Sequence, residues 1–436
     1  MTNIFQFPEC IFLTLQSFLS HKDYRNTLNS CKKDYFLRLK KKSCCYYLSP
    51  ISTSRYLSDA SFQNQILSLI ERPEKQLGIN VQALQALPNL DKFREISSFK
   101  NLNVLFAKVS FDFSIFCSAQ RLIVTDCDQP LSLNGLVSLV DLYLKNFSKL
   151  SDISGLSNCR ALTKVCFSSC NKLTNINSLA HVEVIEIESC PINDAGIAYL
   201  GGSLQYLKLD SVSDVTNLNH LYSLKKLHVC ACKSLKSISG LLMLKDLGIW
   251  NCPNLPTYSH LPALQNLLAT GDHNFHLNYS DSLQVKQCFL YGSIPIEPAK
   301  LVNFVSLELL NLTFNKNDIT LDLNCLSQLA SLKVLDIDCM TQNQQFNIHL
   351  FQNVRWISVK QCQSFEGIIE PMPNLRTLIV LECDKLRSLS GLEGNHRMKL
   401  KIKDCQITPT LSLFSLLING IESLVYDVYY SVSRVI

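Results

Sequence analysis

The spacing of apolar residues before cysteine recurs along most of this chain and limits its fold more than any other feature of the sequence. Nine cysteines each follow one apolar residue by three positions and another by five: Cys127, Cys170, Cys190, Cys232, Cys252, Cys288, Cys362, Cys383 and Cys405. The full unit has the form Leu-x-x-Leu-x-Leu-x-x-Cys, with Val or Ile in place of the third Leu at 224–232, 244–252 and 375–383. The interval is 20 residues from Cys232 to Cys252 and 22 from Cys383 to Cys405. A period of this length predicts stacked repeats, because no single repeat buries its apolar face alone.

The unit continues with a second half that varies little. Segments 150–156, 235–241 and 386–392 each end in Ser-Gly-Leu. Degenerate copies fill the gaps and place other residues in the cysteine position, namely Phe147, Val212, Asp272, Asn315 and Met340. This pattern strongly resembles the leucine-rich repeat family. The resemblance implies an α/β repeat solenoid, a horseshoe with a parallel concave sheet, of about 14–16 repeats over residues 77–436.

The cysteine of each unit has a structural interpretation. We expect the Leu-x-Leu segment to be a short strand with its apolar residues inward, and the cysteine to follow where the chain turns. There, a small residue with a weak donor satisfies backbone carbonyl groups inside the stack. Because the chain is expected to be intracellular, its thiols should stay reduced. A metal- or redox-responsive protein is the alternative, and it predicts bound metal or a stability that changes with chelator.

The sequence carries no motif for catalysis or for cofactor binding. The tight cysteine pairs, Cys44-Cys45 and Cys230-Ala-Cys232, lack the second pair or the spaced histidines of a zinc site. No nucleophile elbow, phosphate-binding glycine loop or His-Glu-x-x-His occurs. We therefore expect a protein that is not an enzyme and that uses no cofactor and no metal.

Charge and hydropathy exclude two further classes. The chain is 47% hydrophobic, so it can bury a large core, and it has 41 basic and 36 acidic residues. Residues 1–50 hold eight of the basic and three of the acidic residues, so 33 of each sign remain elsewhere. This balance argues against a nucleic-acid groove. Apolar runs such as 411–418 fall short of the roughly 18 residues of a spanning helix, and 11–19 is a poor signal peptide. We expect a cytoplasmic or nuclear protein, or both.

Residues 1–45 do not follow the repeat period and predict a small helical head. Apolar residues recur at helical spacing within 11–19, and Pro8 occupies a first-turn position that tolerates proline. The head resembles an F-box, on the residues Phe7-Pro8-Glu9, Ile11, Leu15, Phe18-Leu19, Asp23, Leu28, Cys31-Lys32-Lys33 and Tyr35. The resemblance implies binding to a Skp-type adaptor, and through it to a cullin, by Phe7, Pro8, Ile11, Leu15, Phe18 and Leu19.

An F-box followed by leucine-rich repeats is a known architecture. It implies a substrate-recognition subunit of a Skp/cullin/F-box (SCF) ubiquitin ligase, whose repeats hold the target protein. The alternative is a leucine-rich repeat interaction scaffold unrelated to ubiquitin, whose head only caps the solenoid, as a repeat array requires. Between head and repeats, the periodicity of 59–70 predicts a helical connector or N-terminal cap over residues 46–76.

The strand pattern also predicts which residues bind the target. In each unit, the residue before the second leucine and those after the second and third should point away from the core. The candidates in these columns are Tyr143, Glu186, Glu188, Tyr206, Lys208, Asp210, His228, Trp250, Trp356 and Lys360. Because tryptophan is enriched at binding hot spots, we expect a site centred on Trp250 with Trp356 as a second anchor.

The repeat period slips in two places, at 272–304 and 313–331. Each stretch is either an inserted loop or a distorted repeat. Pro295 and Pro298 favour a loop in the first.

Overall fold

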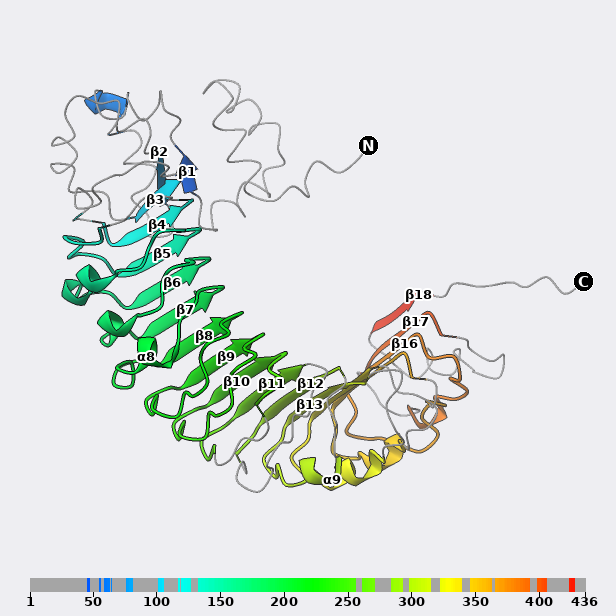
Figure 1. The fold of residues 1–436 in the computed structure, drawn as a ribbon. Helices are drawn as coiled ribbons and strands as arrows, with labels where there is room; N and C mark the ends of the chain where they lie inside the picture. Colours follow the sequence, from blue (N-terminus) through cyan, green and yellow to red (C-terminus); the bar gives the residue numbers. More distant parts are fainter. Residues whose placement is uncertain are drawn as a thin grey trace, which may run out of the picture. The chain divides into compact units, whose positions relative to one another are not determined.

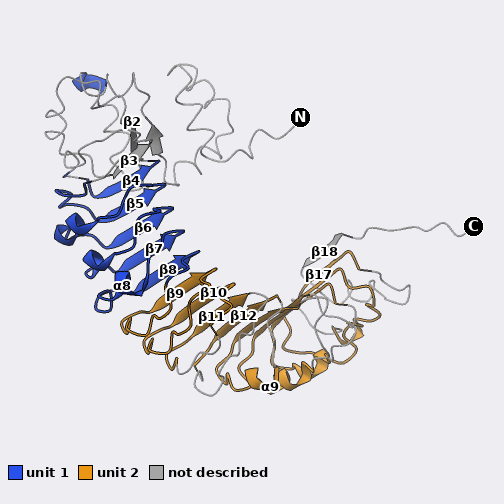
Figure 2. Ribbon diagram, viewed as in Figure 1, with its two compact units in different colours: residues 1–214 blue, residues 215–436 orange. Residues whose placement is uncertain are grey.

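A computed structural model of the chain is shown in Figure 1. It describes residues 119–126, 132–255, 261–270, 284–292, 298–314, 322–338, 346–362, 365–392 and 398–405, a few positions near 55–64, Cys117, and the backbone of four further strands. The chain divides into two compact units, residues 1–214 and residues 215–436, which are described one at a time (Figure 2). The predicted adaptor-binding residues lie outside the described residues, so the F-box-like head stays a prediction.

Unit 1 contains a stack of parallel strands. These are β1 (Cys45–Tyr47), β2 (Gln76–Asn80), β3 (Asn101–Leu105), β4 (Arg121–Thr125), β5 (Asp141–Lys145), β6 (Lys164–Ser168), β7 (Val184–Glu188) and β8 (Tyr206–Asp210). Each strand pairs in parallel with the next. The return segments carry the 3₁₀ helices η3 (Ser154–Asn158) and η4 (Asn177–Leu179) and the helix α8 (Asp194–Ile197).

Unit 2 repeats the arrangement. Its strands are β9 (Lys226–Cys230), β10 (Asp246–Trp250), β11 (Asn266–Thr270), β12 (Gln287–Tyr291), β13 (Leu309–Thr313), β14 (Val334–Asp338), β15 (Trp356–Lys360), β16 (Thr377–Leu381), β17 (Lys399–Lys403) and β18 (Ser423–Asp427), again parallel from neighbour to neighbour. Its return segments carry α9 (Pro298–Leu301), η5 (Asn324–Gln328), η6 (Ile348–Leu350) and η7 (Ser390–Leu392). The two units confirm the predicted parallel solenoid.

The first strand, β1, falls at the junction between the predicted head and the predicted connector. Its parallel pairing with β2 means that strand pairing reaches back to residue 45, ahead of the position 77 where we placed the repeats. Helical backbone occurs at 60–62, where the Asp59 carboxylate accepts the N–H groups of Ser61 and Phe62 over 3.0 and 3.1 Å. The division into residues 1–45, 46–76 and 77–436 stays a prediction.

Alternation within each strand from β4 to β17 separates core from surface. The second and fourth residues are buried, as Leu142 and Leu144 are in β5, because successive side chains of a strand point to opposite faces. In register, Leu142 pairs with Val165 and Val165 with Ile185, so equivalent side chains stack from turn to turn. The first, third and fifth residues form the other surface of each sheet, which we call the open sheet face. The predicted columns therefore lie where the repeat pattern placed them.

The cysteine position is also where the pattern placed it, two residues after the strand. Between strand and cysteine stands a left-handed residue, such as Ala231 with φ 51°, whose N–H donates to the Trp250 carbonyl over 2.8 Å. The thiol then turns inward, and Cys232 Sγ donates to the Cys230 carbonyl over 3.4 Å. Phe147 and Val212 are buried at the same position of their turns. The structural interpretation of these cysteines is confirmed for the described turns.

Cys288 was assigned to the wrong position. It is the second residue of β12, beside Leu267 and Leu310, and is fully buried there. Leu283 and Val285 imitate the preceding apolar pair, although the inward pair of this strand is Cys288 and Leu290. Burial raises the pKa of the Cys288 thiol to about 12, so it stays protonated at neutral pH.

The described parts of the two stretches in which the period slips contain repeat elements. Residues 272–304 contain β12, which pairs on both sides, and α9, which begins at Pro298. Residues 313–331 contain η5, a return-segment helix. The described parts of both stretches therefore belong to repeats, and proline at 298 starts a helix because its missing N–H has no intrahelical acceptor there.

Two return-segment glycines allow successive turns to approach closely. A Cβ atom at Gly196 would overlap the carbonyl oxygen of Thr174, and one at Gly240 would overlap that of Asn219. Both obstacles are backbone atoms of the preceding turn, which no rotamer change removes. The Ser-Gly-Leu motif, of which Gly240 is part, thus reflects turn-to-turn packing.

Candidate functional site

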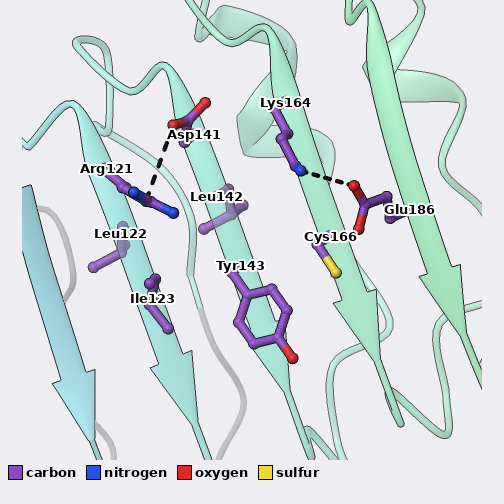
Figure 3. Close-up of a pocket in the computed structure, with 9 residues that line it drawn as sticks. All are labelled: Arg121, Leu122, Ile123, Asp141, Leu142, Tyr143, Lys164, Cys166 and Glu186. Carbon is purple, nitrogen blue, oxygen red and sulfur yellow. Dashed lines mark hydrogen bonds and ion pairs between the residues drawn. The ribbon is translucent and has the colours of Figure 1, made fainter. Parts of the chain in front are cut away.

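A pocket lies on the open sheet face of unit 1, across β4 to β7 (Figure 3). Its volume is about 320 Å³, and its lining residues are Arg121, Leu122, Ile123, Asp141, Leu142, Tyr143, Lys164, Cys166 and Glu186. We call it the unit 1 pocket. Figure 3 shows the Tyr143 ring standing between the strands that carry Ile123 and Cys166.

The floor of the unit 1 pocket comes from one row of the sheet. Ile123, Tyr143 and Cys166 are the third residues of adjacent strands, and the register pairs each with the next. Parallel strands lie about 4.8 Å apart, so these side chains form a continuous apolar strip. Glu186 follows Cys166 in the same row and ends the strip with a charge.

Charged side chains from the first row border this strip. Lys164 Nζ lies 2.7 Å from Glu186 Oε1, and Arg121 Nε lies 4.0 Å from Asp141 Oδ2. All four side chains are partly exposed, between 26% and 47%. Ion pairs of this kind contribute little to stability, but they place both signs of charge beside an apolar strip.

The titratable groups in the floor are neutral at physiological pH. Burial and the nearby Glu186 carboxylate raise the pKa of Cys166 to about 12. Burial also raises the pKa of Tyr143. A thiol with a raised pKa is a poor nucleophile, because the thiolate is the reactive form. The described residues also contain no group of three or more His, Cys, Asp and Glu side chains that could hold a metal ion. The pocket is therefore suited to binding and lacks an activated thiol.

Two of the predicted target-binding residues, Tyr143 and Glu186, line this pocket. The other four in unit 1 lie beside it on β7 and β8: Glu188, Tyr206, Lys208 and Asp210. Lys208 pairs in register with Glu186, and Glu188 accepts a hydrogen bond from Ser168 Oγ over 3.2 Å. The sequence prediction missed Arg121, Lys164 and Cys166 as site residues, and it read Asp141 in an outward column without choosing it as a candidate. The column rule that selected Tyr143 finds all four when it is applied to β4, β5 and β6.

The predicted residues of unit 2 form separate groups. Trp250 packs edge to face on His228, with ring centroids 5.6 Å apart, and lies over Gly248, whose added Cβ would sit 2.5 Å from the indole. Trp356 and Lys360 occupy opposite ends of β15. Five strand spacings separate β10 from β15, on the order of 24 Å. A target that contacts both tryptophans must therefore reach across five strand spacings of the sheet.

Comparison with solved structures supports the architecture. A leucine-rich repeat protein of Leptospira interrogans superposes with a TM-score of 0.53 at 15% identity, covering 86% of this chain and 98% of its own. The fold is a leucine-rich repeat solenoid. At this identity the likeness shows the fold alone.

Two further solved structures were matched less well. An internalin from Listeria monocytogenes has a TM-score of 0.36 at 14% identity, covering 85% of this chain and 96% of its own. A plant peptide hormone receptor, RGFR1 in complex with RGF2, has a TM-score of 0.35 at 14% identity, covering 78% and 68%. The sequence matches no family model and no curated protein. Among the described residues, no helix is long and apolar enough to cross a membrane.

Proposed function

We propose that this leucine-rich repeat solenoid binds a protein partner, and that the unit 1 pocket receives an apolar side chain of that partner. The observation that carries the proposal is the apolar strip of Ile123, Tyr143 and Cys166 between charged neighbours. Protein interfaces have this anatomy, with an apolar centre and a polar rim. Tyrosine at the centre of such a patch is a frequent hot spot.

The absence of catalysis is part of the same proposal. Cys166 is held as the neutral thiol, and the Lys164 and Glu186 side chains neutralise each other across 2.7 Å. These groups suit recognition of a surface with both charges. The rim charges would set the orientation of the partner more than its affinity.

Tyr143→Ala is expected to weaken partner binding about 10-fold or more, because truncation removes the aromatic centre of the pocket. The partner is first captured by photocrosslinking the full chain with a reactive group in place of Lys164, and its affinity is then measured by calorimetry. Tyr199→Ala is the matched control, since Tyr199 is 74% exposed on the return segment after α8. Equal affinity of the Tyr143 variant and wild type would contradict the proposal.

A finer proposal concerns the ubiquitin system. It rests on the F-box resemblance of residues 7–35 and assigns the chain to an SCF ligase as its substrate receptor, in the cytoplasm or nucleus. The repeat array supports the substrate-binding half of this proposal only. The alternative is an interaction scaffold unrelated to ubiquitin, whose head only caps the solenoid. This alternative requires only the leucine-rich repeat solenoid, so it agrees with the fold more directly than the ubiquitin ligase proposal does.

Replacing Pro8 and Leu15 together by alanine tests the finer proposal. In the full chain, we expect loss of binding to a purified Skp-type adaptor, because both residues match adaptor-binding positions of the F-box. Far-ultraviolet circular dichroism should keep the signal of the repeats, which the head does not form. Adaptor binding that persists in the double variant, or that is missing in the wild type, would leave the head as a solenoid cap.

A further inference from the structure

A polar cluster on the open sheet face of unit 2 has a composition unlike its surroundings. Asn311, Asp336 and Ser358 are the third residues of β13, β14 and β15, and the register places them side by side. Lys360 Nζ lies 3.1 Å from Asp336 Oδ2, and Asn311 Nδ2 donates to the same oxygen over 2.6 Å. Asp338 stands in the fifth row, paired with Lys360. We call these five residues the β14 cluster.

Four buried polar atoms of the β14 cluster have no hydrogen-bond partner. They are Asn311 Oδ1, Asp336 Oδ1, Asp338 Oδ1 and Ser358 Oγ. Ser358 is fully buried, with 0% exposure. A buried acceptor without a donor destabilises the folded state, so native structures normally satisfy such groups. Three of the four atoms are acceptors only, so a group that satisfies them has to donate hydrogen bonds.

A second triad in unit 2 shows that this deficit is not general. Lys226 Nζ lies 3.1 Å from Asp246 Oδ2, while Asn266 Nδ2 donates to the other oxygen, Asp246 Oδ1. The two donors use different oxygens, and neither oxygen is left without a partner. In the β14 cluster both donors meet at Asp336 Oδ2, so Oδ1 receives nothing.

The β14 cluster also carries an unbalanced charge. Asp336 and Asp338 give two negative charges and Lys360 one positive charge. All other first-, third- and fifth-position residues of β12 to β16 are uncharged. Burial and the Asp336 charge raise the pKa of Tyr291 on β12, which places its hydroxyl in the field of the cluster. One excess negative charge among uncharged neighbours favours a single incoming cation.

We propose that the β14 cluster binds the guanidinium group of an arginine side chain presented by the protein partner. Arginine supplies one positive charge and five N–H donors in a fixed plane, whereas lysine offers a compact, strongly hydrated ammonium. The proposal rests on the protein-binding function above and adds the chemistry of one contact. Lys360 is the group that the arginine displaces, because its side chain is 32% exposed against 13% for Asp336.

Substitution of Lys360 distinguishes a lysine that competes with the incoming arginine from a lysine that itself contacts the partner. If Lys360 competes with the ligand for Asp336, then Lys360→Met strengthens arginine binding several-fold. If Lys360 is itself a contact to the partner, the same substitution weakens binding. Asp336→Asn removes the charge and is expected to weaken arginine binding at least 10-fold.

The test uses the full chain labelled with 5-fluorotryptophan and short peptides of one sequence with arginine, lysine or citrulline at the centre. The chain has two tryptophans, so fluorine NMR gives one signal from Trp356, on the strand of Ser358, and one from Trp250 as an internal control. We expect the arginine peptide to shift the Trp356 signal alone, with weaker binding of the lysine peptide and none of the citrulline peptide.

Three variants complete the experiment. Asp336→Asn should abolish the shift, Asp246→Asn should keep it, and Tyr143→Ala should keep it while losing partner binding at the unit 1 pocket. Thermal unfolding of each variant shows that it is folded. Equal binding of citrulline and arginine, no shift with any peptide, or weaker binding after Lys360→Met overturns the arginine assignment. The Tyr143 result bears only on the protein-binding proposal, so the two failures are distinguishable.

Discussion

Gly196→Ala is expected to lower the free energy of unfolding by about 1–3 kcal/mol, as overpacking of a close-packed interior does. The new Cβ atom would overlap the carbonyl oxygen of Thr174 in the preceding turn. A backbone hydrogen bond ties Gly196 to the preceding turn, since its carbonyl accepts the N–H of Ile176 over 2.8 Å. Relief of the overlap between the Cβ atom and the carbonyl oxygen therefore requires two turns of the solenoid to move apart.

Gly202→Ala provides the matched control for this prediction. It lies six residues further along the same unit, and an added Cβ would meet no atom within 4 Å. Its expected effect is within about 0.5 kcal/mol of zero. Urea unfolding followed by circular dichroism measures both variants. Similar midpoints for the two would show that turn-to-turn contact at Gly196 tolerates a methyl group.

Phe147→Ala is expected to cost about 3–5 kcal/mol, the range for deleting a buried aromatic side chain. Phe147 has 0% exposure and is among the largest fully buried side chains of the described residues. It stands where other turns place a cysteine, so it fills more of the stack than a thiol does. Hydrogen exchange of the β5 and β6 amides measures the loss of stability.

Val137→Ala is the control for Phe147, because Val137 is 58% exposed in the same unit. Each turn of a repeat array contacts mainly its neighbours, so the faster exchange should be concentrated around β5. A uniform increase across every described strand of unit 1 would show that the unit unfolds only as a whole. A loss below 1 kcal/mol would contradict tight packing at Phe147.

The repeat spacing alone located most of the described strands. An inward residue pair followed by a small buried residue is a local pattern, so it could be read without knowledge of neighbouring turns. Even the degenerate copies at Phe147 and Val212 were placed correctly, because the inward pairs Leu142–Leu144 and Leu207–Leu209 precede them. Cys288 was misplaced because Leu283 and Val285 imitate such a pair five residues early.

The candidate sites were less predictable because they depend on neighbouring turns. The column rule selects Tyr143 and Glu186 and also reaches Cys166, but only the strand register shows that these three side chains lie next to one another in a single pocket. The unpartnered oxygen of Asp336 depends on where Asn311 and Lys360 direct their donors. Side-chain rotamers of this kind leave no trace in residue spacing.

The turn after each strand has a consequence for how such a chain evolves. In the turns that the structure describes at this position, a left-handed residue with φ between 49° and 60° occupies the junction between strand and cysteine position ten times. The return segments vary instead, since Asp246 to Asn266 spans 20 residues and Leu309 to Val334 spans 25. Insertions and deletions are thus absorbed away from the open sheet face. Selection can therefore lengthen the return segments and substitute residues of the open sheet face independently, because neither change alters the register between neighbouring strands.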